Sequence, residues 1–528
     1  MPKRRARSQD KLVAAMRDPS FYPSSPATVT HKETHISHIF FVGDLVYKIK
    51  KPVHFSFLDY STLAKRHRFV KAELRLNRRL APSVYLAVVP ITKSGMSWQL
   101  AGKGKAGEYS LVMRRLPEKR MMPFLLERQD VTSGMMRELA DFVASFHKRA
   151  KRIVPAAPWR YPKLAQRQWD DNLTDLKNVA GESADAEMVA LLKETGSRFI
   201  EQHSDLLIKR AKQGWIRDVH GDLHCENICF SSEGIQIFDC IEFSSQFRQS
   251  DLVSEIAFLI MDLEARGAGS LVEPFLKRYR RVVADPDLLR LLPFYKSHRA
   301  LIRGKVQLLR AAPGTAARYF RLAARFTWES FKPFLLIVCG LTGSGKSMLA
   351  RELGERLGMP VINSDALRKS LMTEPGAQRV GFNTGIYSPW VTEKTYAKIA
   401  HRAEKEILNG TGAILDATFR AKVERERILR LARKHHIPCL VIRCFASAET
   451  TKRRLERRNT EGADVSDGRW EIYLRQVATA EPMDEVPPAD RLELNTEQPA
   501  DQLARESEQF LRRRLNMVLF DGVKRSPG

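Results

Sequence analysis

The eight residues GLTGSGKS, at positions 340–347, constrain the fold more than any other stretch of this 528-residue chain. The apolar run FLLIVC comes before them, and the helix-like run MLARELGERLG follows. A buried strand that passes through a glycine loop into a helix places backbone N–H groups around phosphate oxygens, at the helix end where the dipole favours anions. The sequence therefore predicts an α/β unit that binds the phosphates of ATP.

The residue types in this loop predict their roles. Lys346 is expected to reach the β- and γ-phosphates, and the Ser347 hydroxyl is expected to bind Mg²⁺. The other residues that we expect to contact ATP are Gly340, Leu341, Thr342, Gly343, Ser344 and Gly345.

Two later stretches indicate which kind of P-loop protein this sequence resembles. PVINSDALRKSL is predicted to be a strand ending in Asp365, with Arg368 one helical turn further, and GAILDATF a strand ending in Asp416. This arrangement resembles the small-molecule and polynucleotide kinases that have a P-loop. The resemblance implies that Asp365 accepts the proton of the acceptor hydroxyl and that Arg368 binds the acceptor or an attached anion. Asp416 would then occupy a Walker-B-like place and reach Mg²⁺ through water.

The segment AETTKRRLERRNTEGADVSDGRW carries four arginines on a predicted helix. We expect a lid that closes over the transferring phosphates, and we assign the catalytic role to Arg454 and Arg458, which share one face. Arg453 and Arg457 share another face, and the sequence leaves open which face looks inward. The alternative is a solvated basic face.

A second cluster is HGDLHCEN at residues 220–227. Asp222 stands five residues before Asn227, and Asp239 arrives in IQIFDCIEF after a Ser-Ser-Glu-Gly turn. An acid, an asparagine and a second acid after a hairpin is the layout of a phosphoryl-transfer loop. In such a loop one carboxylate meets the acceptor hydroxyl, while an amide oxygen and another carboxylate hold Mg²⁺.

HGDLHCEN together with FDCIEF resembles the aminoglycoside phosphotransferase family, kinase-fold enzymes that phosphorylate hydroxyl groups of small molecules. The resemblance implies that Asp222 is the catalytic base and that Asn227 and Asp239 are Mg²⁺ ligands. It also implies that His220 orders the loop, and we give His224 a structural or orienting role. The alternative is that the two histidines bind a metal, although no third ligand stands at a useful spacing.

The stretch DLVYKIKKP resembles the strand that carries the ATP-anchoring lysine of this family. Strand alternation places Val46, Lys48 and Lys50 on one face. We predict Lys48 as the anchor and Glu73 as its helix partner, with Lys50 and Lys51 as competing lysines. No GxGxxG stands before the lysine, and the polar turn THIS would have to cover the phosphates instead.

These patterns define a domain organisation. We expect a small β-rich lobe at residues 1–125, a helical lobe with the catalytic loop at 126–331, and a P-loop domain at 332–528. The expected fold is an α+β protein-kinase-like bilobal domain followed by an α/β P-loop NTPase domain with a parallel sheet. The whole chain resembles a bacterial family that fuses an aminoglycoside-phosphotransferase-like domain to a P-loop ATPase of the AAA, gluconate-kinase-like or polynucleotide-kinase-like kind. The resemblance implies two ATP sites that use Mg²⁺.

Composition narrows the class of protein. Hydrophobic residues make up 43% and charged residues 28%, the balance of a globular chain. Six cysteines without a CxxC pair indicate reduced thiols rather than a disulfide framework. With no signal-peptide pattern and no apolar run of membrane-spanning length, we expect a cytoplasmic protein with no membrane partner. The net charge of +27 makes nucleic acid a possible partner, but no stretch mixes Arg, Gly and aromatics as RNA-binding modules do.

The main functional hypothesis is a bifunctional phosphotransferase that moves the γ-phosphate of ATP to hydroxyl groups of small molecules at both sites. One alternative is a nucleotide-responsive regulatory ATPase in which one ATP site is a sensor. Another is polynucleotide 5′-kinase activity in the C-terminal domain. The sequence names neither phosphate acceptor and leaves the coupling between domains and the oligomeric state open.

Overall fold

The computed structural model describes residues 2–55, 58–94, 97–180, 186–370, 389–461 and 470–523. The chain divides into two compact units, Met1–Ala323 and Ala324–Gly528. The division lies within helix α12 (Pro313–Glu329). The boundary expected at residues 331–333 and the lobe limit at residue 125 stay predictions.

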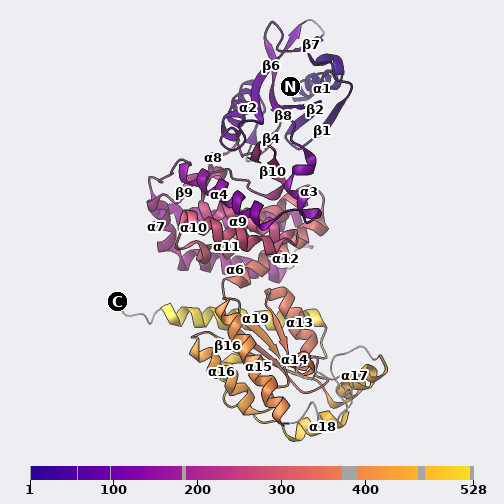
Figure 1. The fold of residues 1–528 in the computed structure, drawn as a ribbon, viewed down its shortest axis with the longest axis vertical. Helices are drawn as coiled ribbons and strands as arrows, with labels where there is room; N and C mark the ends of the chain where they lie inside the picture. The colour runs from indigo at the N-terminus through magenta and orange to yellow at the C-terminus, as the bar shows by residue number, and fades with distance from the viewer. Residues whose placement is uncertain are drawn as a thin grey trace. The chain divides into compact units, whose positions relative to one another are not determined.

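The first unit begins with helix α1 (Pro2–Met16) and a six-stranded antiparallel sheet in the order β1-β2-β3-β8-β6-β7. The strands are β1 (Val29–Glu33), β2 (Ser37–Val42), β3 (Leu45–Lys50), β6 (Tyr85–Ser94), β7 (Ser97–Leu100) and β8 (Ala106–Arg114). A short hairpin of β4 (His54–Phe55) and β5 (Leu58–Asp59) leads into helix α2 (Leu63–Asn77). Helix α2 packs against β6 and β8 (Figure 1).

Strand alternation in β3 separates two kinds of side chain. Tyr47 and Ile49 are buried in an apolar cluster with Phe40. Because successive side chains of a strand point to opposite faces, Lys48 and Lys50 lie on the other face, which helix α2 covers. The strand therefore delivers two lysines to one place.

The rest of the first unit is mainly helical. Its elements are α3 (Met122–Glu127), α4 (Ser133–Arg149), α5 (Tyr161–Ala180), α6 (Ala186–Gln202), α7 (Ser204–Gln213), β9 (Ile216–Asp218), β10 (Ile228–Ser231), β11 (Gly234–Ile237), α8 (Ser245–Arg248), β12 (Gln249–Asp251), α9 (Leu252–Ala265), α10 (Val272–Val283), α11 (Leu288–Leu309) and α12. Helix α9, LVSEIAFLIMDLEA, is apolar around nearly its whole circumference and is almost entirely buried. A helix of this kind forms the core of its lobe, and here α11 and the turn at 225–227 pack on it.

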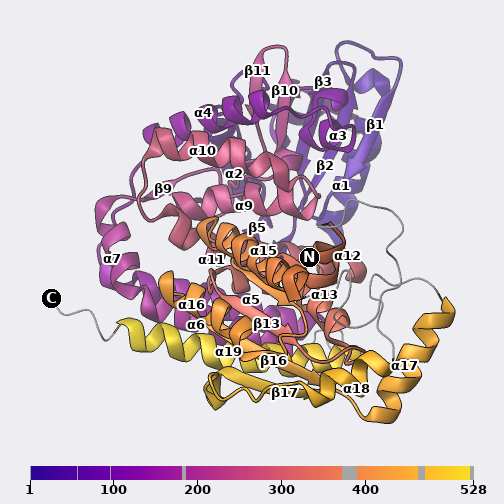
Figure 2. The ribbon, with the colours of Figure 1, turned by 60° about the horizontal axis from the view of Figure 1, so that its bottom comes forward.

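The second unit is a five-stranded parallel sheet in the order β14-β15-β13-β16-β17. The strands are β13 (Leu335–Cys339), β14 (Val361–Asn363), β15 (Ala413–Asp416), β16 (Cys439–Phe445) and β17 (Arg491–Asn495). The helices are α13 (Lys346–Leu357), α14 (Ser364–Ser370), α15 (Pro389–Leu408), α16 (Lys422–Lys434), α17 (Ala448–Glu461), α18 (Trp470–Ala478) and α19 (Ala500–Val523). Helix α13 contacts α19, and α15 contacts α16, so that helices cover the sheet on both faces (Figure 2).

The chain thus forms the α+β unit of two lobes and the parallel α/β unit that the sequence predicts. The strand predicted to end in Asp365 is shorter, because β14 ends at Asn363 and Asp365 lies in the first turn of α14. Among the helices of the described ranges, none has the length and apolar character to cross a lipid bilayer.

Candidate active sites

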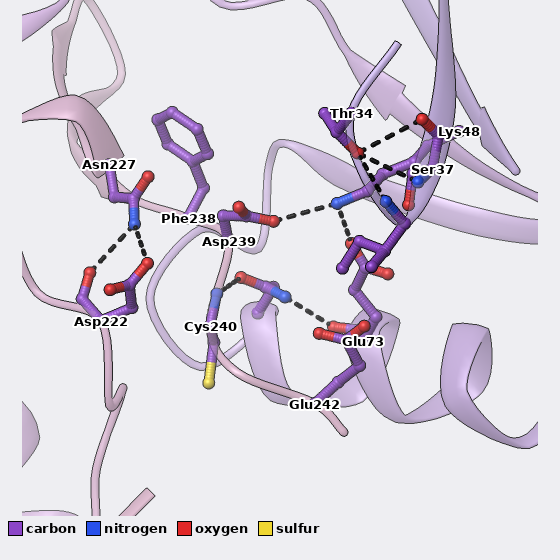
Figure 3. Close-up of polar contacts among 12 residues, drawn as sticks. Thr34, Ser37, Lys48, Glu73, Asp222, Asn227, Phe238, Asp239, Cys240 and Glu242 are labelled. Atoms are coloured by element: carbon purple, nitrogen blue, oxygen red, sulfur yellow. Dashed lines mark hydrogen bonds and ion pairs between the residues drawn. The ribbon is translucent and has the colours of Figure 1, made fainter. Parts of the chain in front are cut away.

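The loop HGDLHCEN connects β9 to β10 and brings its acid and its asparagine together. The Nδ2 group of Asn227 donates hydrogen bonds to the backbone oxygen of Asp222 at 2.9 Å and to its Oδ2 at 3.2 Å (Figure 3). Asn227 is buried, whereas the Asp222 side chain is one-third exposed. The amide therefore fixes the carboxylate while leaving it open to a ligand.

Ionisation of Asp222 is favoured by its neighbours. Burial raises the pKa of this carboxyl, but His224, whose Nε2 lies 3.3 Å from Oδ2, together with His220 and Arg303 outweighs burial and leaves the pKa well below its usual range. Burial lowers the pKa of His220 to about 4. His220 is then neutral at pH 7, and it accepts the Asp222 N–H at Nδ1 while its Nε2 contacts the Phe238 oxygen at 2.9 Å.

Both ring nitrogens of His220 have hydrogen-bond contacts, whereas His224 uses its Nε2 on Asp222 and its Nδ1 has no partner among the described residues. Within the ranges that the structure describes, no group of three or more His, Cys, Asp or Glu side chains is placed to hold a metal ion.

Asp239 follows the β10–β11 hairpin and meets the small lobe. Its backbone has a φ of 62°, and its N–H donates to the Tyr85 hydroxyl at 3.1 Å. Its Oδ1 lies 2.9 Å from Lys48 Nζ, and the same ammonium lies 2.8 Å from Glu73 Oε1 (Figure 3). The structure therefore brings Lys48, Glu73 and Asp239 to one point, although they are far apart in sequence.

Lys50 also reaches the helix glutamate. Its Nζ lies 2.6 Å from Glu73 Oε2, so Glu73 binds both lysines. Sequence reasoning treated Lys50 as a competitor of Lys48, and the structure places the two lysines on the two oxygens of one carboxylate. Lys51 instead pairs with Glu33 and donates to the Thr34 oxygen.

The turn THIS joins β1 to β2 near these residues. Thr34 and Ser37 close it, because the Thr34 hydroxyl accepts the Ser37 N–H at 3.0 Å and the Thr34 N–H donates to the Ser37 oxygen at 2.9 Å (Figure 3). A glycine-free turn of this kind is held by its side chain rather than by backbone freedom.

Two acids of helix α9, which the sequence did not reveal as site residues, bind the backbone of the loop at residues 220–227. Glu255 of α9 is fully buried, and it accepts the N–H groups of His220 at 2.8 Å and Gly221 at 3.1 Å. Asp262, two turns further, accepts the Cys225 N–H at 3.0 Å. The available signal was the two acids within the otherwise apolar run LVSEIAFLIMDLEA, because buried acids need hydrogen-bond partners.

In the second unit, the glycine loop needs its glycines. Gly340, Gly343 and Gly345 have φ values of 146°, 77° and 81°, a region that favours glycine. A Cβ on Gly340 would overlap the Cys444 carbonyl oxygen and lie 2.6 Å from Ser344 Oγ. The Ser344 hydroxyl is buried and has no partner among the described residues.

The remaining loop residues stand where the motif places them. Leu341 and Thr342 lie between β13 and α13, and Lys346 and Ser347 form the first turn of α13. The Thr342 N–H donates to Gln476 Oε1 of helix α18 at 2.8 Å. Gln476 is a contact of this loop that the sequence did not reveal.

Asp416 ends strand β15 beside the loop and is 2% exposed. Its Oδ2 accepts the Asn363 Nδ2 group at 2.6 Å, and its Oδ1 has no partner within the described residues. Parallel pairing sets Asn363 opposite Asp416, and Asp416 opposite Val338, so the carboxyl ends of three neighbouring strands meet here. Ligands of parallel sheets bind at such ends.

Asp365 and Arg368 form an ion pair, and Arg454 contacts the glycine loop. Arg368 Nη1 lies 2.9 Å from Asp365 Oδ1. Arg454 donates to the Thr496 oxygen at 2.7 Å and to the Gly343 oxygen at 3.4 Å, so its guanidinium faces the glycine loop. Arg453 and Arg457 are exposed, and the side chain of Arg458 lies outside the described part of the structure.

Each unit is similar to a known family over part of its length. Residues 55–292 match the phosphotransferase enzyme family, and residues 335–483 match an AAA domain. An uncharacterized protein of Mycobacterium tuberculosis (strain ATCC 25618 / H37Rv) is 29% identical over 447 residues, which are 82% of this chain and 87% of that protein. An uncharacterized protein of Mycobacterium bovis matches to the same extent.

Two solved structures have a partial likeness to the chain. A choline/ethanolamine kinase family protein from Mesorhizobium loti is 15% identical, covers 59% of this chain and 94% of its own, and has a TM-score of 0.37. A gluconokinase from Sinorhizobium meliloti 1021 is 19% identical, covers 36% of this chain and 97% of its own, and has a TM-score of 0.28.

The two family matches confirm the predicted fusion and give the fold its name, a kinase-like bilobal domain followed by a P-loop domain. The chain is an ATP-dependent phosphotransferase, in which residues 55–292 are similar to the phosphotransferase enzyme family and residues 335–483 are similar to an AAA domain.

Proposed function

We propose that the chain is bifunctional and transfers the γ-phosphate of ATP to hydroxyl groups of small molecules at two separate sites. The observation that carries the proposal is the 2.9 Å contact between Lys48 Nζ and Asp239 Oδ1. This contact pairs an ammonium that is suited to nucleotide phosphates with a carboxylate that is suited to a metal ion. Both lie in the unit whose loop presents Asp222.

The residues at the first site fit Mg²⁺ and ATP. The Asp239 side chain is 51% exposed, and the Asn227 amide uses its nitrogen on Asp222, which leaves its oxygen as a ligand. Carboxylate and amide oxygens are ligands that Mg²⁺ accepts. When bound, the ion would neutralise charge on the phosphates. Lys48 would contact the phosphates, with Glu73 holding it in place.

Asp222 is suited to the acceptor hydroxyl. Its ionised carboxylate is oriented by Asn227 and His224 and would accept the hydroxyl proton as the oxygen attacks the γ-phosphorus. Phosphoryl transfer needs little covalent chemistry from a protein, so positioning of the hydroxyl and neutralisation of charge would supply most of the rate.

The second site would hold ATP in the glycine loop, with Lys346 on the phosphates. Ser347 and, through water, Asp416 would hold Mg²⁺, and the buried Asp416 Oδ1, which has no partner among the described residues, supports this role. Asp365 would be the base and Arg368 would bind the acceptor. Arg454 and Arg458 would act on the phosphates from the lid, and the contact of Arg454 with the Gly343 oxygen supports this placement.

The test is a phosphorylation screen with ATP and a library of hydroxyl-bearing metabolites, to which a 5′-hydroxyl oligonucleotide is added. We expect Asp222→Ala and Lys346→Ala to remove different phosphorylated products, and the double variant to remove both sets. If one single variant removed all products, or neither removed any, the assignment of two sites would be wrong. ATP hydrolysis that no compound stimulates would instead favour a regulatory ATPase, and a labelled oligonucleotide would favour the polynucleotide kinase.

A further inference from the structure

The small lobe contains a buried charge network that a single lysine–glutamate pair would not need. Lys50 Nζ lies 2.6 Å from Glu73 Oε2 and 2.5 Å from Glu242 Oε1. The Lys50 and Glu73 side chains are each 1% exposed and Glu242 is 6% exposed. The Tyr60 hydroxyl donates to Glu242, and its ring lies 4.8 Å from the Lys50 ammonium.

This network connects three parts of the first unit. Lys50 belongs to β3, Glu73 to α2, and Glu242 stands three residues after Asp239. Asn77 reinforces the connection, because its Oδ1 accepts the Cys240 N–H at 2.8 Å and its Nδ2 donates to the backbone oxygen of Glu73 at 2.9 Å. Helix α2, whose Glu73 binds Lys48, is thus joined to the segment that carries Asp239 (Figure 3).

The charges show why Lys50 is needed. Glu73 and Glu242 are two buried carboxylates beside two lysines. Without Lys50, both carboxylates would compete for the Lys48 ammonium, because a buried charge without a partner is costly. With Lys50 in place, Glu73 keeps one cation permanently, and Lys48 is free to exchange its contact with Asp239 for a phosphate oxygen.

We propose that Lys50 and Glu242 are positioning residues for the ATP site of the first unit and act through Lys48. This inference rests on the proposed function of that site. Lys50 neutralises Glu73 and Glu242 and holds helix α2 in place, so that Lys48 meets the nucleotide phosphates without a rearrangement of the helix. Lys50 itself does not touch the nucleotide.

The experiment is a double-mutant cycle on nucleotide affinity in the full-length chain. Lys346→Ala serves as the background, so that the second site is silenced. The dissociation constant of a Mg²⁺ complex of non-hydrolysable ATP is measured by calorimetry for the background, Lys48→Met, Lys50→Met and the combined variant. Lys65→Met is the matched control, because it removes a lysine of the same lobe whose partner Asp59 is one-third exposed and which, in the described part of the chain, contacts no residue of the proposed site.

We expect Lys50→Met to weaken nucleotide binding about tenfold, the effect of a lost charge-assisted contact. Lys65→Met should change binding less than about twofold, because its ion pair is at the surface. When Lys48 is already methionine, replacing Lys50 should cause no further loss, because residues that act through one another are not additive. A general loss of stability would instead weaken nucleotide binding by the same factor whether residue 48 is lysine or methionine.

Each outcome has a separate meaning. Unchanged binding in Lys50→Met, or additive losses in the cycle, would overturn the positioning role. Unchanged binding in Lys48→Met would instead refute the proposed nucleotide site. If circular dichroism shows that Lys50→Met does not fold, the same cycle is run with Glu242→Gln. We then expect about threefold weaker nucleotide binding when residue 48 is lysine and no further weakening when it is methionine.

Discussion

Ionisation of Glu255 should make the catalytic loop of the first unit less stable as pH rises. This carboxyl is fully buried in α9 and accepts the N–H groups of His220 and Gly221. Burial raises its pKa from 4.5 to about 7, although Arg299 and the two N–H groups act in the opposite direction. A carboxyl with a raised pKa favours folding in its protonated form, so its contribution is complete below pH 4.5 and is lost as pH rises through 7.

The size of the effect follows from the same values. A rise in pKa from 4.5 to about 7, at about 1.4 kcal/mol for each pH unit, amounts to about 3 kcal/mol. Glu255→Gln cannot ionise and keeps an oxygen that accepts a backbone N–H, so the pH-dependent part should disappear in this variant.

The assay is hydrogen–deuterium exchange of the peptide that contains His220 and Gly221, corrected for the intrinsic pH dependence of exchange. A local measurement is preferable because a chain of two units need not unfold in one step. Between pH 5 and pH 8, the opening free energy of the wild-type loop should fall by about 2.5 kcal/mol relative to Glu255→Gln, because part of the effect is already lost at pH 5. A difference between the two proteins that does not change with pH would refute the reasoning.

Three further predictions concern the two sites. Asp222→Asn should lower turnover at the first site by about a thousandfold while Mg²⁺–ATP affinity changes less than about threefold, because the carboxylate meets the acceptor rather than the nucleotide. Single-turnover kinetics measures the first quantity and calorimetry the second, and a parallel loss of affinity would contradict the assignment. Gly340→Ala should abolish nucleotide binding to the second unit, because the new Cβ overlaps the Cys444 oxygen, whereas Gly314→Ala, where a Cβ meets nothing within 4 Å, should leave binding unchanged in the same titration. Asn363→Ala should lower second-site turnover about 10- to 100-fold, because Asp416 loses its 2.6 Å donor. Turnover equal to that of the wild type at every Mg²⁺ concentration would refute a positioning role for Asn363.

Some parts of the first site could be predicted from sequence because local geometry determines them. The spacing of Asp222 and Asn227 places both on one short loop, and strand alternation places Lys48 and Lys50 on one face of β3. The pattern could not distinguish the two lysines, because the choice depends on where helix α2 and Glu242 come to lie. The structure uses both lysines, one on each oxygen of Glu73.

The second site divides in the same way. The glycine pattern predicted a loop between a strand and a helix, because positive φ values and close approach to Cys444 admit only glycine there. Strand length was harder to predict, and β14 ends at Asn363 rather than at Asp365. The pairing of Asn363 with Asp416 follows from the strand order of the sheet, which no local pattern reveals.

By itself the sequence determined the two-unit organisation, the phosphate-binding loop and the Asp–Asn–Asp layout, because backbone conformation and periodicity depend on residues close together in the chain. Only the tertiary structure decided the partners of the buried charges: Glu255 under the catalytic loop, Glu242 on Lys50, and Asn363 on Asp416. A buried charge is stable only beside a group of complementary charge or a hydrogen-bond partner, and that partner is supplied by whichever distant segment the fold brings there.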